Sequence, residues 1–165
     1  MPDNIPMQKS PALRTILWAG LVCGTMDITA ALTVYPYFGA KRIPLLQGIA
    51  AGILGEQSFQ GGWATAALGL LCHYFIAYSA ATVFYFVSRR MAWLIEHAVA
   101  AGVLYGITVY YVMGWIIVPL SRARKFGFSY KMMMIGIVIH IICVGLPIAL
   151  VVRRFSGQNK EIVNE

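Results

Sequence analysis

Charged side chains are scarce in this sequence, and their scarcity excludes most classes of soluble protein. Only 12% of the 165 residues are Asp, Glu, Lys or Arg, whereas 59% are hydrophobic. A soluble globular domain carries about 25% charged residues. The mean hydropathy of +0.72 indicates the same class. We therefore expect an integral membrane protein.

The alternation of polar and apolar residues that marks a half-buried strand is also missing. Instead, the charges avoid four apolar segments at about residues 15–35, 64–87, 98–120 and 132–152. A helix of about 20 residues crosses the hydrocarbon core of a bilayer. Because lipid offers the backbone no hydrogen-bond partners, these segments should be helical. The sequence predicts an all-α polytopic membrane protein, with four transmembrane helices in an antiparallel bundle over residues 15–154.

The chain outside these segments is predicted to form two tails and one short helix. Residues 1–14 contain Pro2, Pro6 and Pro11 and are expected to be a mobile tail, and residues 155–165 a polar, frayed tail. The first loop holds an apolar stretch at about residues 44–55, with Pro44 at its start. Proline is favoured in the first turn of a helix. Since this stretch is too short to span, we expect an interfacial or re-entrant helix.

Basic residues outnumber acidic ones, 13 to 6, but their positions argue against binding to nucleic acid. They gather at the ends of the apolar segments, as in Lys41-Arg42, Arg89-Arg90 and Arg153-Arg154. Membrane proteins anchor against anionic lipid head groups in this way. The lipid bilayer is therefore the expected partner. Basic residues divide almost evenly between the two sides, and we place both termini in the cytoplasm because the first loop is the more elaborate.

Motifs of common catalytic sites are absent as well. Cys23, Cys72 and Cys143 lie inside apolar segments without the CxxC spacing of zinc or redox sites. No serine or cysteine stands at a recognisable nucleophile elbow. We therefore expect a function that is not enzymatic.

One polar side chain is nonetheless expected near the middle of the membrane in each apolar segment. Asp27, His73, Tyr110 and His140 lie at similar distances from the first-loop side of the membrane. At 1.5 Å per residue, that distance is roughly 13–16 Å, close to the midplane. Ionisable groups are costly at this depth and usually have a role. These four residues are predicted to form a buried polar layer.

Several functions fit such a layer. As a structural hydrogen-bond set, it would fix the register of the four helices. Alternatively, Asp27 and the histidines would relay protons, small ions or solutes across the membrane. A third alternative is haem b held by His73 and His140, and a fourth is a metal site that adds Asp27 to these two histidines. Gln47 and Glu56, in the first loop, are candidates for an entrance to the layer.

Glycines recur near the polar residues. Both histidines follow a glycine by four residues, in Gly69–His73 and Gly136–His140, a spacing that leaves room for a haem macrocycle and suggests an internal duplication. Two GxxxG patterns, at Gly20/Gly24 and Gly102/Gly106, are typical of close helix packing in membranes. They would pack the bundle internally or build a homo-oligomer.

The run from Leu46 to Gly55, the run from Gly61 to Gly69 and the following His73 resemble a group of uncharacterised small bacterial inner-membrane proteins. The layout of four helices with a histidine in the second is distantly similar to the YagU-like family. The resemblance covers about residues 19–154. It implies a bacterial cytoplasmic (inner) membrane location and brings no activity with it.

Overall fold

The structure is a computed structural model that describes residues 11–123 and 129–162, with side chains for residues 12–123 and 129–156. Every regular element in these ranges is helical, and no strand occurs in them, so the all-α prediction is confirmed. Four helical stretches are long and apolar enough to cross a membrane. They are α1 (Pro11–Val34) with η1 (Tyr35–Phe38); α3 (Gly62–Ser88); α5 (Ala98–Val112) with η3 (Met113–Ile117) and α6 (Val118–Leu120); and α7 (Tyr130–Ile139) with η4 (His140–Gly145) and α8 (Leu146–Ile162).

Two of these helices extend beyond the ends predicted from the sequence. Helix α1 begins at Pro11, so residues 11–14 are not part of the predicted mobile tail; the fixed φ of proline suits a first helical turn. Helix α8 continues to Ile162, where a frayed polar tail was expected. Hydropathy marks where the apolar stretch ends, but helical hydrogen bonds continue past that point into polar sequence. Residues 1–10 and 163–165 lie outside the described residues.

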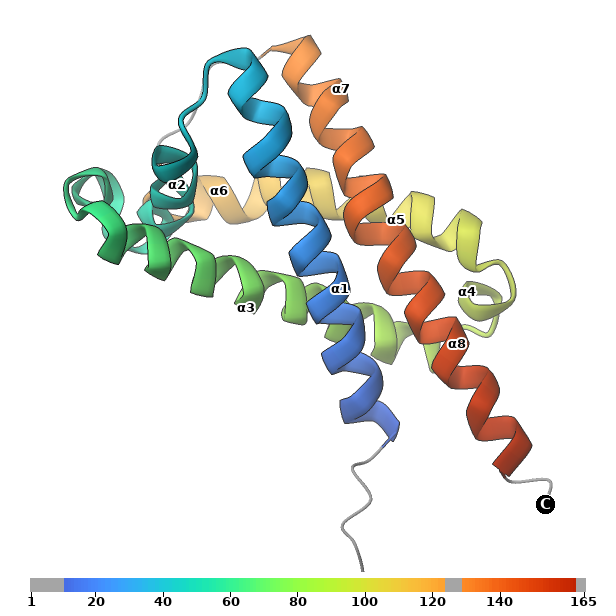
Figure 1. Cartoon of the computed structure of the whole chain (residues 1–165). Coiled ribbons are helices and arrows are strands. Elements are labelled where there is room, and N and C mark those ends of the chain that lie inside the picture. Colours follow the sequence, from blue (N-terminus) through green and yellow to red (C-terminus); the bar gives the residue numbers. More distant parts are fainter. Residues whose placement is uncertain (1–10, 124–128, 163–165) are drawn as a thin grey trace, which may run out of the picture.

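The four spans pack on one another as two crossing pairs. In Figure 1, α1 (blue) and the α7–α8 span (orange to red) lie next to each other and cross α3 (green) and the α5–α6 span (yellow). Helix α1 packs on both α3 and α8, while α5 packs on η4 and α8. The buried core lies where these spans meet and consists of small and medium side chains, among them Ala19, Cys23, Ala77, Ala81, Phe84, Ala101, Ile148 and Val152.

The glycines predicted to pack helices do so inside the chain. Gly20 and Gly24 face the rings of Tyr78 and Tyr74 on α3. Gly102 and Gly106 lie against the backbone of the fourth span near His140, Gly145 and Leu146. Without side chains at these positions the helix backbones approach closely, which is how membrane helices gain packing contacts. Both GxxxG faces are therefore used within one chain.

The first loop forms the predicted short helix, α2 (Arg42–Leu54), followed by the 3-10 segment η2 (Gly55–Gln60). Helix α2 packs along α3, where Gly69 contacts the carbonyl group of Leu46. Gly69 lies roughly 10 Å along α3 from its start, given the rise per residue of an α-helix. Thus α2 lies beside the first third of a membrane span, an arrangement that favours a re-entrant helix over one on the surface. The second loop contains one further turn, α4 (Trp93–Glu96).

Candidate functional site

Helices α1 and α3 bring Asp27 and His73 together within the membrane-spanning part of the chain. Nδ1 of His73 lies 4.0 Å from Oδ2 of Asp27. The two side chains are only 11% and 19% exposed, respectively. Isolated charges are expensive in such surroundings, and pairing lowers that cost. Asp27 and His73, two residues of the predicted polar layer, therefore lie next to each other.

The close approach depends on Gly24, one turn before Asp27. Nε2 of His73 donates a hydrogen bond to the carbonyl oxygen of Gly24 at 2.9 Å. The ring of Tyr74 also packs over Gly24, and its hydroxyl is 2.9 Å from that of Thr25. A side chain at position 24 would meet this ring. The glycine therefore lets the histidine reach the backbone of the neighbouring helix.

This hydrogen bond fixes the tautomer of His73. A carbonyl oxygen only accepts hydrogen bonds, so the proton of a neutral His73 ring must be on Nε2. Nδ1 then presents a lone pair toward Asp27, and an ionised carboxylate also only accepts. Two acceptors facing each other repel, whereas one added proton turns the contact into an imidazolium–carboxylate ion pair. The arrangement can therefore bind one proton.

The distance between Nδ1 of His73 and Oδ2 of Asp27 shows whether the two atoms form a direct hydrogen bond. A direct hydrogen bond between nitrogen and oxygen spans about 2.7–3.2 Å. At 4.0 Å, the Nδ1–Oδ2 contact is longer than that. A small rotation of either side chain would bring the two atoms within hydrogen-bond range. The pair is thus close enough to share a proton.

Tyr110 and His140 form a second pair, between the third and fourth spans. Their rings are nearly perpendicular, with centroids 5.4 Å apart. Nδ1 of His140 donates to the carbonyl oxygen of Gly136 at 2.9 Å, and the ring of Tyr110 covers Gly136 itself. His140 is also the first residue of the π-helix η4. Single π-helical turns within α-helices frequently mark functional sites.

The four predicted residues thus form two pairs. Tyr35, in η1, is half-buried and lies within electrostatic range of Asp27 and of Tyr110, one member of each pair. Tyr35 was not among the residues predicted from the sequence, where it only ends the first apolar segment. Its position about two helical turns beyond Asp27 could have placed it on the same side of the helix.

The contacts around the histidines do not fit the haem b predicted as an alternative. Gly69, expected to leave room for the macrocycle, is covered by the backbone of α2 at Leu46. The space over Gly136 is filled by the ring of Tyr110. Nε2 of His73 is already bonded to Gly24. The two GxxxH patterns therefore have different surroundings, and the proposed duplication stays a prediction.

The alternative metal site of Asp27, His73 and His140 does not assemble either. Within residues 11–123 and 129–162, no three or more His, Cys, Asp or Glu side chains come together in a group able to hold a metal ion. Asp27 meets His73, whereas His140 bonds within its own span. Three ligands in one coordination sphere are what such a site needs.

The two predicted entrance residues differ in position. Gln47 is buried, and its amide nitrogen donates to the carbonyl oxygen of Gly62 at 3.0 Å and to the hydroxyl of Thr65 at 3.3 Å. It therefore ties α2 to the start of α3, a role that the entrance prediction did not anticipate. Glu56, in η2, is exposed. It is the residue of the two that remains available at the surface.

Comparison of the chain with protein-family models, with curated protein sequences and with solved structures gives no match. The resemblance to the YagU-like family therefore stays a prediction.

Proposed function

We propose that the Asp27–His73 pair binds and releases a proton inside the membrane, and that the protein translocates protons or small ions through its buried polar layer. The observation that carries this proposal is the orientation of the His73 ring. Its Nε2 is held by the Gly24 carbonyl group, while Nδ1 faces the carboxylate of Asp27. Ionisable residues buried in this way form the proton relays of many membrane proteins.

A polar path toward one side of the membrane supports the same function. Tyr35 follows Asp27 toward the first-loop end of the first span. Tyr110 and His140 continue the polar layer across to the third and fourth spans. A tyrosine hydroxyl both donates and accepts hydrogen bonds, so it can pass a proton along. The path therefore leads from the buried pair toward the side where α2 lies.

We further propose that the protein is non-enzymatic and resides in the bacterial cytoplasmic membrane with both termini in the cytoplasm. The folded first loop, with α2 and η2, supports its placement outside. The bilayer is the partner implied by the four spans. Because four spans are few for a transport path, we also propose a homo-oligomer, built through lipid-facing surfaces and not through the internally packed GxxxG faces.

A purely structural layer is the competing explanation. The bond from His73 to Gly24 ties α3 to α1 and would fix their register whatever the charge of the ring. Such a role requires no proton exchange. The two explanations therefore predict different proton fluxes for Asp27→Asn, which removes the charge of Asp27 and keeps its shape.

Proton flux into liposomes distinguishes them. Protein is reconstituted with a pH-sensitive dye inside the vesicles, and a potassium gradient with valinomycin supplies the driving force. We expect flux from the wild type and none from Asp27→Asn. Glu56→Gln, which removes an exposed carboxylate, is the matched control and should retain wild-type flux. Wild-type flux equal to that of empty liposomes, or equal flux from Asp27→Asn, would overturn the proposal in favour of a structural layer.

A further inference from the structure

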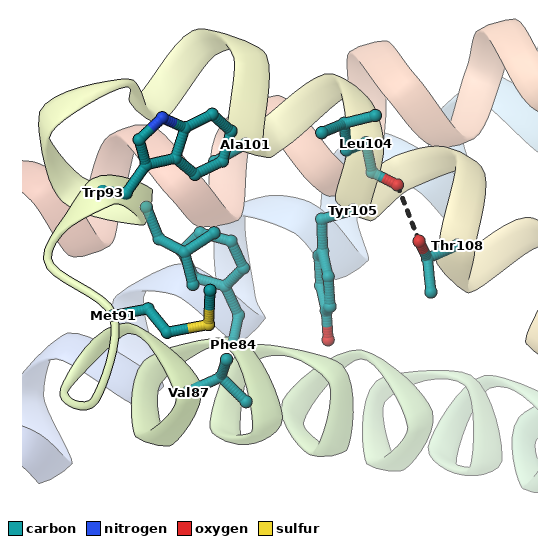
Figure 2. Close-up of a pocket in the computed structure, with 9 residues that line it drawn as sticks. Phe84, Val87, Met91, Trp93, Ala101, Leu104, Tyr105 and Thr108 are labelled. Atoms are coloured by element: carbon teal, nitrogen blue, oxygen red, sulfur yellow. Dashed lines mark hydrogen bonds between the residues drawn. The ribbon is translucent and has the colours of Figure 1, made fainter.

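An apolar groove opens between α3 and α5 near the second loop (Figure 2). Its volume is about 190 Å³. The floor is formed by the buried side chains of Phe84 and Ala101, and Val87 and Leu104 form exposed edges. Met91 and Trp93 lie at the end nearest the loop. The groove therefore runs from the membrane surface into the apolar part of the spans.

A tyrosine that lines the groove joins α5 to α3. The hydroxyl of Tyr105 donates to the carbonyl oxygen of Ala80 at 2.7 Å, and its ring meets that of Phe84 with centroids 4.9 Å apart. At the loop end, the backbone N–H groups of Arg90 and Met91 both donate to the carbonyl oxygen of Val87. This turn closes one end, while the side facing lipid stays open.

Positive charge lies at the closed end. Arg89 and Arg90 directly follow α3, between the groove-lining residues Val87 and Met91, and both are exposed. Neither forms a salt bridge in the part of the chain that the structure describes. Trp93 stacks on His97 within the second loop, with ring centroids 5.4 Å apart. Arginine and tryptophan together at the end of a span are typical of the head-group region.

We propose that this groove binds one acyl chain of an anionic phospholipid, with the lipid phosphate at Arg89 and Arg90. An acyl chain matches the apolar lining, and it enters from the bilayer through the open side. Each arginine near the membrane surface attracts anionic lipid, and a guanidinium group binds phosphate oxygens in bidentate geometry. Glu96 is the acidic residue of α4, and it does not line the groove. This inference is independent of the proposed proton pathway.

Fluorescence of Trp93 tests the proposal. Trp18, Trp63 and Trp115 are replaced by phenylalanine, which leaves Trp93 as the only reporter. The protein is placed in vesicles that contain an equal fraction of brominated phosphatidylglycerol or brominated phosphatidylcholine. Bromine quenches tryptophan fluorescence on contact. Lipids that merely surround the protein therefore give the same background quenching in both kinds of vesicle. We expect at least twofold greater quenching with phosphatidylglycerol, and its reversal by unbrominated phosphatidylglycerol.

Two sets of variants locate the lipid. Arg89→Gln with Arg90→Gln should abolish the preference for phosphatidylglycerol. Val87→Phe fills the groove and should reduce the excess quenching, whereas Val83→Phe, on an exposed part of α3 outside the groove, should leave it unchanged. Equal quenching by the two lipids, or a preference unaffected by these arginine or Val87 variants, would overturn the proposal. If a variant fails to fold, competition by unbrominated phosphatidylglycerol still tests the lipid preference in the protein that keeps only Trp93.

Discussion

The carbonyl oxygen of Gly24 accepts a hydrogen bond from Nε2 of His73, so one glycine sets both the approach of α1 to α3 and the tautomer of the histidine. Asp27 lies one turn further along α1, opposite the other ring nitrogen. The polar layer is therefore asymmetric. His73 faces a carboxylate on another helix, while His140 bonds to its own span and packs on Tyr110.

Replacement of His73 by phenylalanine should lower stability. The variant His73→Phe keeps an aromatic ring but loses the bond to Gly24 and leaves Asp27 without its partner. Polar contacts between membrane helices contribute about 0.5–1.5 kcal/mol each. We expect a loss of that size in thermal unfolding in detergent. His97→Phe is the control, since His97 is exposed and a phenylalanine can still stack on Trp93. Equal stability of the two variants would contradict the interhelical bond.

Replacement of Gly69 by alanine should displace α2. The new methyl group would overlap the backbone of α2 at Leu46, and a backbone cannot rotate away as a side chain can. Overpacking of this kind costs about 1–3 kcal/mol. Gly48→Ala, on α2 itself, meets no atom within 4 Å and should be neutral or slightly stabilising. Thermal unfolding of the two variants measures the difference. A neutral Gly69→Ala would show that α2 does not pack on α3 at this point.

Replacement of Gln47 by leucine should weaken the junction of α2 with α3. The change keeps the side chain's approximate size but removes the donor that bonds to Gly62 and Thr65. We expect a loss of about 1–2 kcal/mol, because two hydrogen bonds that join α2 to the start of α3 are lost. Gln57→Leu makes the same substitution at an exposed position and should change stability by less than about 0.5 kcal/mol. Similar losses for both would argue that Gln47 has no anchoring role.

The four spans could be predicted from the sequence because the bilayer imposes a length and a composition on each of them. The same counting predicts a common depth for Asp27, His73, Tyr110 and His140. Depth is one coordinate, however, and contact also depends on how each helix is rotated and how the helices cross. The sequence could not show that His73 faces α1. That contact is possible because Gly24, on α1, has no side chain, and the two residues are far apart in the chain.

Identical patterns also acquired different roles. Gly69 and Gly136 both precede a histidine by four residues, yet one is covered by α2 and the other by the ring of Tyr110. Gln47 was a candidate entrance residue in the first loop, but α2 packs along α3 and the Gln47 side chain is buried. The π-helical turns η3 and η4 have no signature in the hydropathy pattern. Each difference arises from packing between segments distant in the chain.

The position of the proton on the His73 ring in lipid is the direct test of the proposed pair. Solid-state NMR of the protein with ¹⁵N-labelled histidine, assigned with His73→Gln, reports the two ring nitrogens separately. We predict that Nε2 carries the proton of the neutral ring, and that Asp27→Asn changes the signal of Nδ1, which faces the Asp27 carboxylate. A neutral His73 ring protonated at Nδ1, or an Nδ1 signal that is the same in the wild type and in Asp27→Asn, would contradict the pairing.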